Sequence, residues 1–195
     1  MRLLLVRHGE TVWNAERRLQ GQRDVPLSTL GEHQAVSLRP VVEEHRPTSA
    51  VASPLARAAR TLALLGHPEA STDARWMEAN LGEWTGRTAT ELLSMGEPYA
   101  DWRAGRYTPP GGESFESLTD RVVRAADELT RGEGVALVVT HGGPIRAIIR
   151  HYIGLAPELM VPVDPASLTI VDFAEGPRLR AYSVQVAAAR FSPPD

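Results

Sequence analysis

The chain has 195 residues, a formal net charge of -3, no cysteine and no lysine, so all 21 of its Lys+Arg residues are arginines. The lack of cysteine excludes a disulfide framework, a thiolate nucleophile and a Cys-ligated metal site. The lack of lysine excludes a Schiff base and a Walker-type phosphate loop. The length suits one domain over residues 1–195, and the slightly acidic balance argues against a nucleic-acid partner.

The hydropathy of the chain predicts neither a targeting segment nor a membrane anchor. The apolar start, residues 1–6, is too short for the core of a signal peptide, and no run of ~18 apolar residues occurs. We therefore expect a soluble, cytoplasmic protein without a membrane partner.

Strands and helices alternate in the first part of the chain. The apolar patterns predict, in order, a strand over residues 3–6, a helix over 28–45, a strand over 50–52 and a helix over 55–65. Ser53 and Pro54 are interpreted as the N-cap and the first residue of the last of these helices. Each strand is thus followed by a turn and a helix, as in a parallel sheet.

The segment over residues 76–110 has a different composition. Trp76, Trp84, Tyr99, Trp102 and Tyr107 lie there among glycine and proline breaks. We interpret the segment as an insertion that covers the sheet edge and the active site. Its aromatic side chains fit either a lid around the substrate or the insertion's own small core.

Thr88 and Glu91 are spaced as a capping box, which predicts a short helix within this segment. Beyond residue 110 the patterns predict a helix over 117–130, a strand over 135–139, a helix over 144–153 and two hairpin strands over 168–173 and 179–184. We expect the tail from Phe191 to be frayed.

This order of elements predicts an α/β fold: a three-layer α/β/α sandwich with a mostly parallel sheet and an antiparallel edge strand. Ligands of such sheets bind beyond the carboxyl ends of the strands. The site is therefore expected at three loops, over residues 7–9, 53–57 and 141–143.

These loops carry two arginines and two histidines that suit a phosphate ester. Arg57 is expected in the first turn of a helix, where the macrodipole disfavours a cation unless an anion lies beside it. Guanidinium groups bind phosphate through two parallel hydrogen bonds, and imidazoles can attack phosphorus or donate to its oxygens. Considered singly, Arg7 and Arg57 could be solvated charges, and His141 a hydrogen-bonded core residue.

Metal binding is the weaker interpretation of the histidines. They lack the helical spacing of metal ligands, and Arg7 beside His8 would repel a cation. We therefore expect no metal and no cofactor. The other histidines are interpreted as surface or packing residues: His33, His45, His67 and His151.

The segment LLLVRHGETVWN resembles the signature of the histidine phosphatase superfamily, in the branch of the cofactor-dependent phosphoglycerate mutases and related small phosphatases. The resemblance continues, in the order of the family, through RRLQGQRDVPLSTLGEHQA, SPLARAARTL, EANLGEWTG, PPGGES and VVTHGGPIRAI. It covers nearly the whole chain and implies a phosphoglycerate mutase-like fold.

The resemblance also implies roles for individual residues. His8 matches the nucleophile, and Glu78 matches the proton donor, although Glu83 would satisfy the bare chemistry equally well. Catalytic or phosphate-binding roles are further implied for Arg7, Asn14, Gln20, Gly21, Arg57, His141 and Gly142. His8 would take the phosphoryl group while Glu78 protonates the leaving oxygen and later activates water.

We therefore predict a phosphomonoester hydrolase that acts through phosphohistidine on a small phosphorylated metabolite. The compact stretch between Glu78 and His141 favours hydrolysis over the alternative, a cofactor-dependent phosphoglycerate mutase. A non-catalytic module that binds phosphorylated ligands is a second alternative. Sugar phosphates, phosphoglycerate derivatives, a ribazole-type nucleoside phosphate and phosphoproteins all stay open as substrates. An edge strand near Leu179 could support a homodimer.

Overall fold

The computed structural model describes residues 1–186, in which six strands form one sheet in the order β3-β2-β4-β1-β5-β6. The strands are β1 (Arg2–Arg7), β2 (Ser49–Ala52), β3 (Ser71–Thr72), β4 (Val135–Thr140), β5 (Leu168–Asp172) and β6 (Arg178–Val184). Strands β1 to β4 are mutually parallel, and β5 pairs antiparallel with both β1 and β6. The mostly parallel sheet with an antiparallel edge is thus confirmed, whereas the short β3 was not expected.

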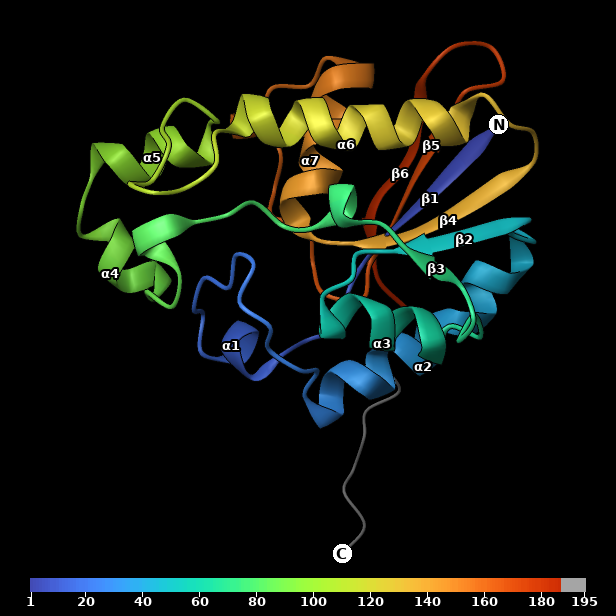
Figure 1. Ribbon diagram of the computed structural model, residues 1–195, viewed down its shortest axis with the longest axis horizontal. Helices are drawn as coiled ribbons and strands as arrows, with labels where there is room; N and C mark the ends of the chain where they lie inside the picture. The colour runs from blue at the N-terminus through green and yellow to red at the C-terminus, as the bar shows by residue number, and fades with distance from the viewer. Residues whose placement is uncertain (187–195) are drawn as a thin grey trace, which may run out of the picture.

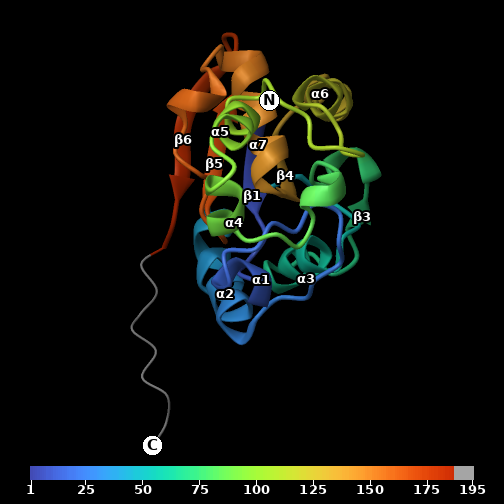
Figure 2. The same cartoon turned by 90° about the vertical axis from the view of Figure 1, so that its left-hand side faces the viewer.

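Helices cover both faces of this sheet (Figures 1 and 2). The α-helices are α1 (Val12–Ala15), α2 (Thr29–Glu44), α3 (Ala56–Leu64), α4 (Ala89–Leu93), α5 (Glu97–Arg103), α6 (Phe115–Thr130) and α7 (Gly142–Ile153). The 3-10 helices are η1 (Ala74–Trp76), η2 (Gly82–Trp84) and η3 (Pro157–Leu159). Helices α6 and α7 lie on one face and α2 and α3 on the other, as the three-layer prediction requires.

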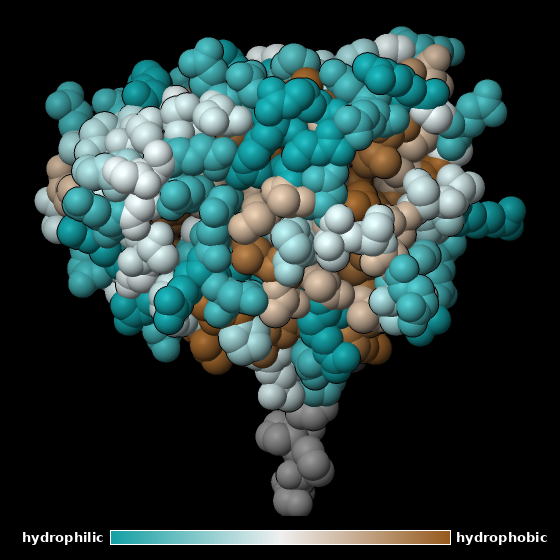
Figure 3. All heavy atoms as spheres, in the orientation of Figure 1, coloured by the Kyte–Doolittle hydropathy of each residue, from teal (hydrophilic) through white to brown (hydrophobic). Residues whose placement is uncertain are grey.

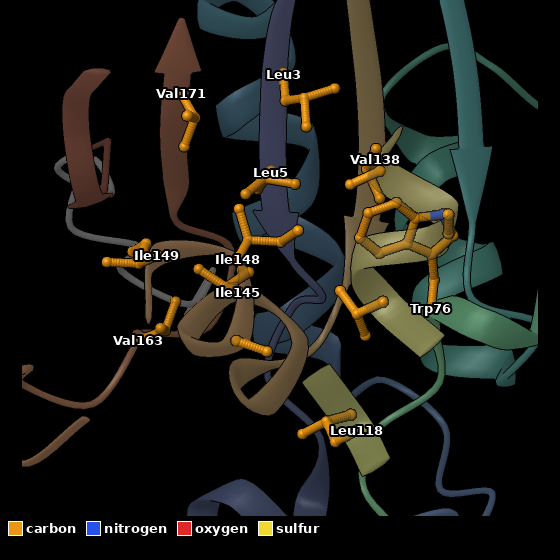
Figure 4. Packing of buried hydrophobic residues seen from close by; sticks show 14 of the residues in the cluster. Leu3, Leu5, Trp76, Leu118, Val138, Ile145, Ile148, Ile149, Val163 and Val171 are labelled. Carbon is orange, nitrogen blue, oxygen red and sulfur yellow. The ribbon is translucent and has the colours of Figure 1, made fainter. Parts of the chain in front are cut away.

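The central strand β1 divides the core in two because successive side chains of a strand point to opposite faces. Leu3 and Leu5 pack with apolar residues of α6 and α7 (Figure 4), while Leu4 and Val6 pack toward α2 and α3. All four side chains are fully buried. This burial on both faces fixes the position and register of β1 in the sheet. The position of the loop that follows β1 is fixed as a result.

Three helices begin at residues other than those predicted. Helix α3 begins at Ala56 after an N-cap, Leu55, that makes no side-chain hydrogen bond. Ser53 is therefore not its cap, because its hydroxyl lies against His141 instead. Helix α6 begins earlier than expected, after Ser114, whose side chain accepts from Ser117. Helix α7 begins at Gly142, so that Pro144 is its third residue, where an N–H would have no partner in the helix.

The segment over residues 76–110 lies beyond the carboxyl end of β1, where α4 and α5 are seen in Figure 1. Thr88 and Glu91 form the expected capping box at α4. Trp84 packs with Leu81 and Leu92 in a small cluster to which Tyr99, Trp102 and Tyr107 also belong. Trp76 is different, since it packs in the main core beside α6 (Figure 4).

The surface is predominantly polar on the face that Figure 3 presents, with hydrophobic side chains confined to smaller areas between hydrophilic ones. Within residues 1–186, no helix is long and apolar enough to cross a membrane. The tail from Phe191 lies outside the described residues.

Candidate active site

The three predicted loops meet at the carboxyl ends of β1, β2 and β4, which are neighbours in the sheet or separated by one strand only. They border a cavity of about 780 Å³ whose wall includes Arg7, His8, Arg57 and Glu78. His141 is fully buried beside this wall, with its ring centroid 5.0 Å from that of His8. The structure therefore brings both histidines and both arginines together.

The backbone of His8 is held on both sides, by strand β4 and by the loop that precedes β5. Its N–H donates to Thr140 at 3.0 Å, and its carbonyl accepts from Ala166 at 3.0 Å. The side chain is 2% exposed, and its Nδ1 lies 2.7 Å from the carbonyl oxygen of Gly9. Since a carbonyl only accepts, Nδ1 carries a proton and Nε2 of the neutral ring carries a lone pair.

The electrostatic surroundings keep this imidazole uncharged. Burial lowers the pKa of His8 well below its usual value, and the charges of Arg7 and Arg57 lower that pKa further. The Nε–H of Arg57 donates to Nε2 of His8 at 3.2 Å. A neutral imidazole with its lone pair beside a guanidinium is suited to attack the phosphorus of an anionic ester.

The loop of His8 is set by a close approach of two backbone segments. A Cβ added to Gly9 would lie 2.3 Å from the carbonyl oxygen of Gly31, and one added to Gly31 would lie 2.0 Å from that of Glu10. The N–H of Gly9 donates to the hydroxyl of Thr61 at 3.1 Å. Gly9, whose carbonyl orients His8, is thus held by the backbone of Gly31 and by the hydrogen bond of its own N–H to Thr61.

Arg57 is the second residue of α3 and is only 1% exposed. Its guanidinium donates to the carbonyls of Arg23 at 2.8 Å and Gly21 at 2.7 Å. Among residues 1–186, no carboxylate forms an ion pair with it. Burial lowers the pKa of Arg57 to about 10, which still leaves the group charged at neutral pH. The cation is therefore oriented by the backbone and its charge is not neutralised by a contact.

Arg7 is held in a similar way, because its guanidinium donates to the carbonyl of Val163. Its Nε is a buried donor that finds no acceptor within residues 1–186. The same is true of Arg146 Nε, and Gln20 Oε1 is a buried acceptor without a donor. These three residues all line the cavity, so polar atoms without protein partners are concentrated around it.

Glu78 lies in the cavity wall, held by backbone groups on two sides. Its Oε2 accepts from the N–H of Gly143 at 3.2 Å, and its Oε1 accepts from Ala79 at 2.9 Å. A Cβ at position 143 would lie 2.2 Å from Oε1, so this placement of Glu78 requires glycine there. Glu83 is exposed and lies outside the cavity wall. The two carboxylates that the sequence left as rivals thus occupy different places.

The four other predicted contact residues also line the cavity: Asn14, Gln20, Gly21 and Gly142. The Oδ1 of Asn14 accepts from the N–H of Thr11 at 3.1 Å and from its hydroxyl at 3.0 Å, which leaves the amide NH₂ for a ligand. Gly142 is the first residue of α7, where a helix presents free N–H groups and a partial positive charge.

The residues whose side chains hydrogen-bond to the backbone of the site residues were not predicted from the sequence. The hydroxyl of Thr61 donates to the carbonyl of Arg57 at 2.7 Å. Arg121 donates to the carbonyls of Met77 at 2.8 Å and Glu78 at 3.0 Å while pairing with Glu113. Such residues leave no signal in a single sequence, because their role depends on contacts between distant segments. Within residues 1–186, no group of three or more His, Asp or Glu side chains could hold a metal ion.

The fold and this site together define an enzyme that acts on phosphate esters. Residues 3–184 match the histidine phosphatase superfamily (branch 1), and the chain belongs to this superfamily. The phosphoglycerate mutase-like fold implied by the sequence is confirmed, and the chain is a histidine-type phosphatase of small phosphorylated metabolites.

Relatives of two kinds are similar to the chain. The glucosyl-3-phosphoglycerate phosphatase of Mycolicibacterium vanbaalenii is 38% identical over 178 residues, covering 84% of this chain and 76% of the relative. The probable phosphoglycerate mutase GpmB of Escherichia coli is 34% identical over 191 residues, covering 90% and 86%.

A solved mycobacterial glucosyl-3-phosphoglycerate phosphatase in complex with VO₃ superposes with a TM-score of 0.86 at 30% identity, covering 94% of this chain and 99% of that one. The same protein in complex with inorganic phosphate gives a TM-score of 0.82 at 29% identity, with 94% and 97% covered.

Proposed function

We propose that this phosphatase hydrolyses its substrate through a phosphohistidine formed on His8. The observation that carries the proposal is the state of this imidazole: it is neutral, its Nδ1–H is held by Gly9, and its Nε2 lone pair lies against Arg57. When phosphorus approaches Nε2, the contact with Arg57 opens, and the Nε–H of that arginine becomes a donor for a phosphoryl oxygen.

In the first step, Nε2 of His8 forms a bond to phosphorus while the bond from phosphorus to the ester oxygen breaks. Arg7, Arg57, His141 and the first N–H groups of α7 are the proposed partners of the phosphoryl oxygens. Glu78 gives its proton to the leaving oxygen, so the alcohol departs neutral. In the second step Glu78 takes a proton from water, the water oxygen bonds to phosphorus, and the bond from phosphorus to Nε2 breaks with its electron pair returning to the ring, so that inorganic phosphate and free His8 result.

The decisive experiment compares wild type with His8→Ala on p-nitrophenyl phosphate. We expect the variant to lose at least about 10³-fold in kcat, as is usual when a nucleophile is removed. Rapid quenching in alkaline detergent after mixing with a ³²P-labelled ester should trap label on the wild type in an acid-labile, base-stable bond and none on the variant. Turnover that survives in His8→Ala would refute the assignment.

The substrate that we propose is a phosphoglycerate derivative carrying a further group, with glucosyl-3-phosphoglycerate as the first candidate. The cavity of about 780 Å³ is larger than a phosphoryl group needs, and Tyr99, Trp102 and Tyr107 line its outer part. Aromatic faces of this kind suit a bulky organic group. The name of a relative that covers most of the chain supports the same class. A panel of phosphate esters ranked by kcat/KM tests this choice.

A mutase is the second candidate, because the GpmB relative carries that name. The assay that separates the two offers 3-phosphoglycerate with and without 2,3-bisphosphoglycerate. Release of inorganic phosphate in both cases supports the phosphatase, whereas interconversion without phosphate release supports the mutase. A module that only binds phosphorylated ligands would show no turnover in either.

Three other expectations stay predictions: a cytoplasmic location, one domain over residues 1–195 covered by the segment 76–110, and a homodimer. Strand β6, which includes Leu179, is at the sheet edge and is the candidate dimer contact. Light scattering after size exclusion measures the oligomeric state, and two charged substitutions on β6 should convert a dimer to a monomer.

A further inference from the structure

Ser53 is a buried hydroxyl to which the proposed chemistry gives no role. It is fully buried, and its Oγ lies 2.8 Å from Nε2 of His141. It follows β2, His141 follows β4, and these parallel strands are neighbours in which Ala52 pairs with Val139. The N–H of Ser53 donates to Val139 at 2.9 Å. The sheet itself therefore places the serine beside the imidazole.

The hydrogen bonds of Ser53 determine which way this contact runs. A hydroxyl has one proton and two lone pairs. The N–H of Leu55 donates to Oγ at 3.3 Å, which uses a lone pair. Within residues 1–186, the hydroxyl proton has no acceptor other than Nε2 of His141. The hydroxyl is thus the donor, and Nε2 carries a lone pair.

The other nitrogen of His141 then carries the proton. Burial, followed by the charge of Arg57, lowers the pKa of His141 well below its usual value, so the ring is neutral and has one N–H. With the lone pair on Nε2, that N–H is at Nδ1. Nδ1 is buried and has no partner within residues 1–186. A buried N–H without an acceptor is costly, and a ligand oxygen would remove the cost.

The opposite tautomer fits the site less well. It would leave the hydroxyl proton of Ser53 without an acceptor and would leave a lone pair on Nδ1. The ring of His141 is 5.0 Å from that of His8 between centroids, so a phosphoryl group on His8 would come close to the ring that carries this lone pair. Lone pair and phosphoryl oxygen would repel each other, whereas an N–H would attract the oxygen.

We propose that Ser53 is a positioning residue that fixes His141 in its Nδ1–H tautomer, so that Nδ1–H is the donor kept for a phosphoryl oxygen at His8. The identity of the acceptor rests on the proposed function. The tautomer, however, is a property of the ligand-free chain and can be measured without any substrate.

Long-range ¹H–¹⁵N spectra of the ¹⁵N-histidine-labelled protein measure the tautomer directly, with the signals of His141 assigned by their loss in His141→Asn. We expect an unprotonated Nε2 and a protonated Nδ1 in the wild type. Protonation at Nε2 would overturn the proposal, even if the chain proves to be an active phosphatase. This measurement does not depend on how any Ser53 variant folds.

Substitutions then test the part of Ser53. In Ser53→Ala we expect His141 to become a mixture of tautomers and kcat/KM to fall by roughly 10-fold, the usual loss when a residue behind a site residue is removed. Ser53→Thr keeps the hydroxyl and should restore the wild-type spectrum. Thr140→Val is the matched control, since it removes a neighbouring buried hydroxyl that donates to Trp76 and not to His141. An unchanged tautomer in Ser53→Ala would overturn the role of the serine.

Titration with inorganic phosphate tests the acceptor. Binding at the site should shift the signals of His8 and move the Nδ1 proton of His141 downfield. If His8 responds and the Nδ1 proton does not, the proposed donation is wrong, while the phosphatase assignment still stands on the His8→Ala experiment. If the tautomer is as expected but no ester is hydrolysed, the proposed function fails and the positioning by Ser53 is retained.

Discussion

The two ends of the cavity differ in how deeply their side chains are buried and in which elements supply them. At the inner end, His8, Arg57 and His141 are almost fully buried and are held by backbone carbonyls or by a buried hydroxyl. At the outer end, Tyr99 and Trp102 are partly exposed and come from the segment over residues 76–110. The inner end is fixed by the sheet, and the outer end is carried by short helices that pack mainly on one another.

This difference separates chemistry from selectivity. In the proposed mechanism the inner groups act on charge that develops at one atom, which requires fixed positions, and the central sheet provides such positions. In that mechanism the outer groups would contact the part of the substrate that lies beyond the phosphate. A change at the inner end should therefore reduce turnover of all esters, and a change at the outer end should alter the choice between esters.

The largest effect is expected when an arginine is removed from the inner end of the cavity, and the matched control removes an arginine from the outer end. Arg57→Gln should lower kcat/KM for p-nitrophenyl phosphate by roughly 10³-fold, because a guanidinium fixed beside the phosphoryl group is lost. Arg103→Gln removes the same charge from the outer wall and should cost less than about 5-fold. Steady-state kinetics on both variants measures this contrast, and equal losses would abolish the distinction between the two ends.

Glu78→Gln should have the next largest effect, and the loss should depend on the leaving group. An alkyl phosphate needs a proton on its leaving oxygen and should be hydrolysed about 10²-fold more slowly, whereas nitrophenolate leaves without one and should lose less. Glu83→Gln, which changes an exposed carboxylate outside the cavity wall, is the control. A uniform loss for both esters would remove Glu78 as the proton donor.

The buried neutral histidines also predict how stability depends on pH. The pKa values of His8 and His141 are lowered by burial, so the unfolded chain binds more protons below about pH 6.5. Their contribution to stability is present above that pH and is lost as the pH falls, at about 1.4 kcal/mol per pH unit for each histidine.

Urea unfolding between pH 7 and 5 measures this slope. His8→Asn should reduce the slope of the unfolding free energy against pH by the contribution of one histidine. That contribution corresponds to about a tenfold change in the unfolding constant per pH unit. His151→Asn removes an exposed imidazole and should leave the slope as in the wild type. The proton linkage assigned to the inner end is contradicted if both variants give the wild-type slope.

The smallest effect on the turnover of p-nitrophenyl phosphate is expected at the aromatic wall, the part of the cavity lining formed by Tyr99, Trp102 and Tyr107. Trp102→Leu removes a ring that contacts Trp84 and Tyr99, with centroids 5.8 Å and 5.7 Å away. We expect kcat/KM for p-nitrophenyl phosphate to change by about twofold and that for the best bulky ester by roughly 10-fold. A loss of the same size on both esters would mean that this ring serves only the packing of the segment.

The strands and the site loops could be predicted from the sequence because their signals are local. The buried runs that became β1 and β4 each end at a histidine, and parallel strands bring such ends together. The choice between Glu78 and Glu83 could not be made from residue types, since it depends on Gly143 of a distant helix. Ser53 was misassigned for a related reason: its local pattern is that of a helix cap, and its partner lies 88 positions further along the chain.

The contact between Gly9 and Gly31 also limits how the site can be altered. A Cβ at either position would collide with backbone atoms of the other segment. A second substitution to a smaller side chain could not make room for it, because no side chain causes the collision. Substitution would have to lift the loop of His8 away from α2 and would move the imidazole of His8 with it. For directed evolution, these two glycines are therefore positions to hold constant, and the aromatic wall of the segment over residues 76–110 is where variation can change the substrate at little risk to the chemistry.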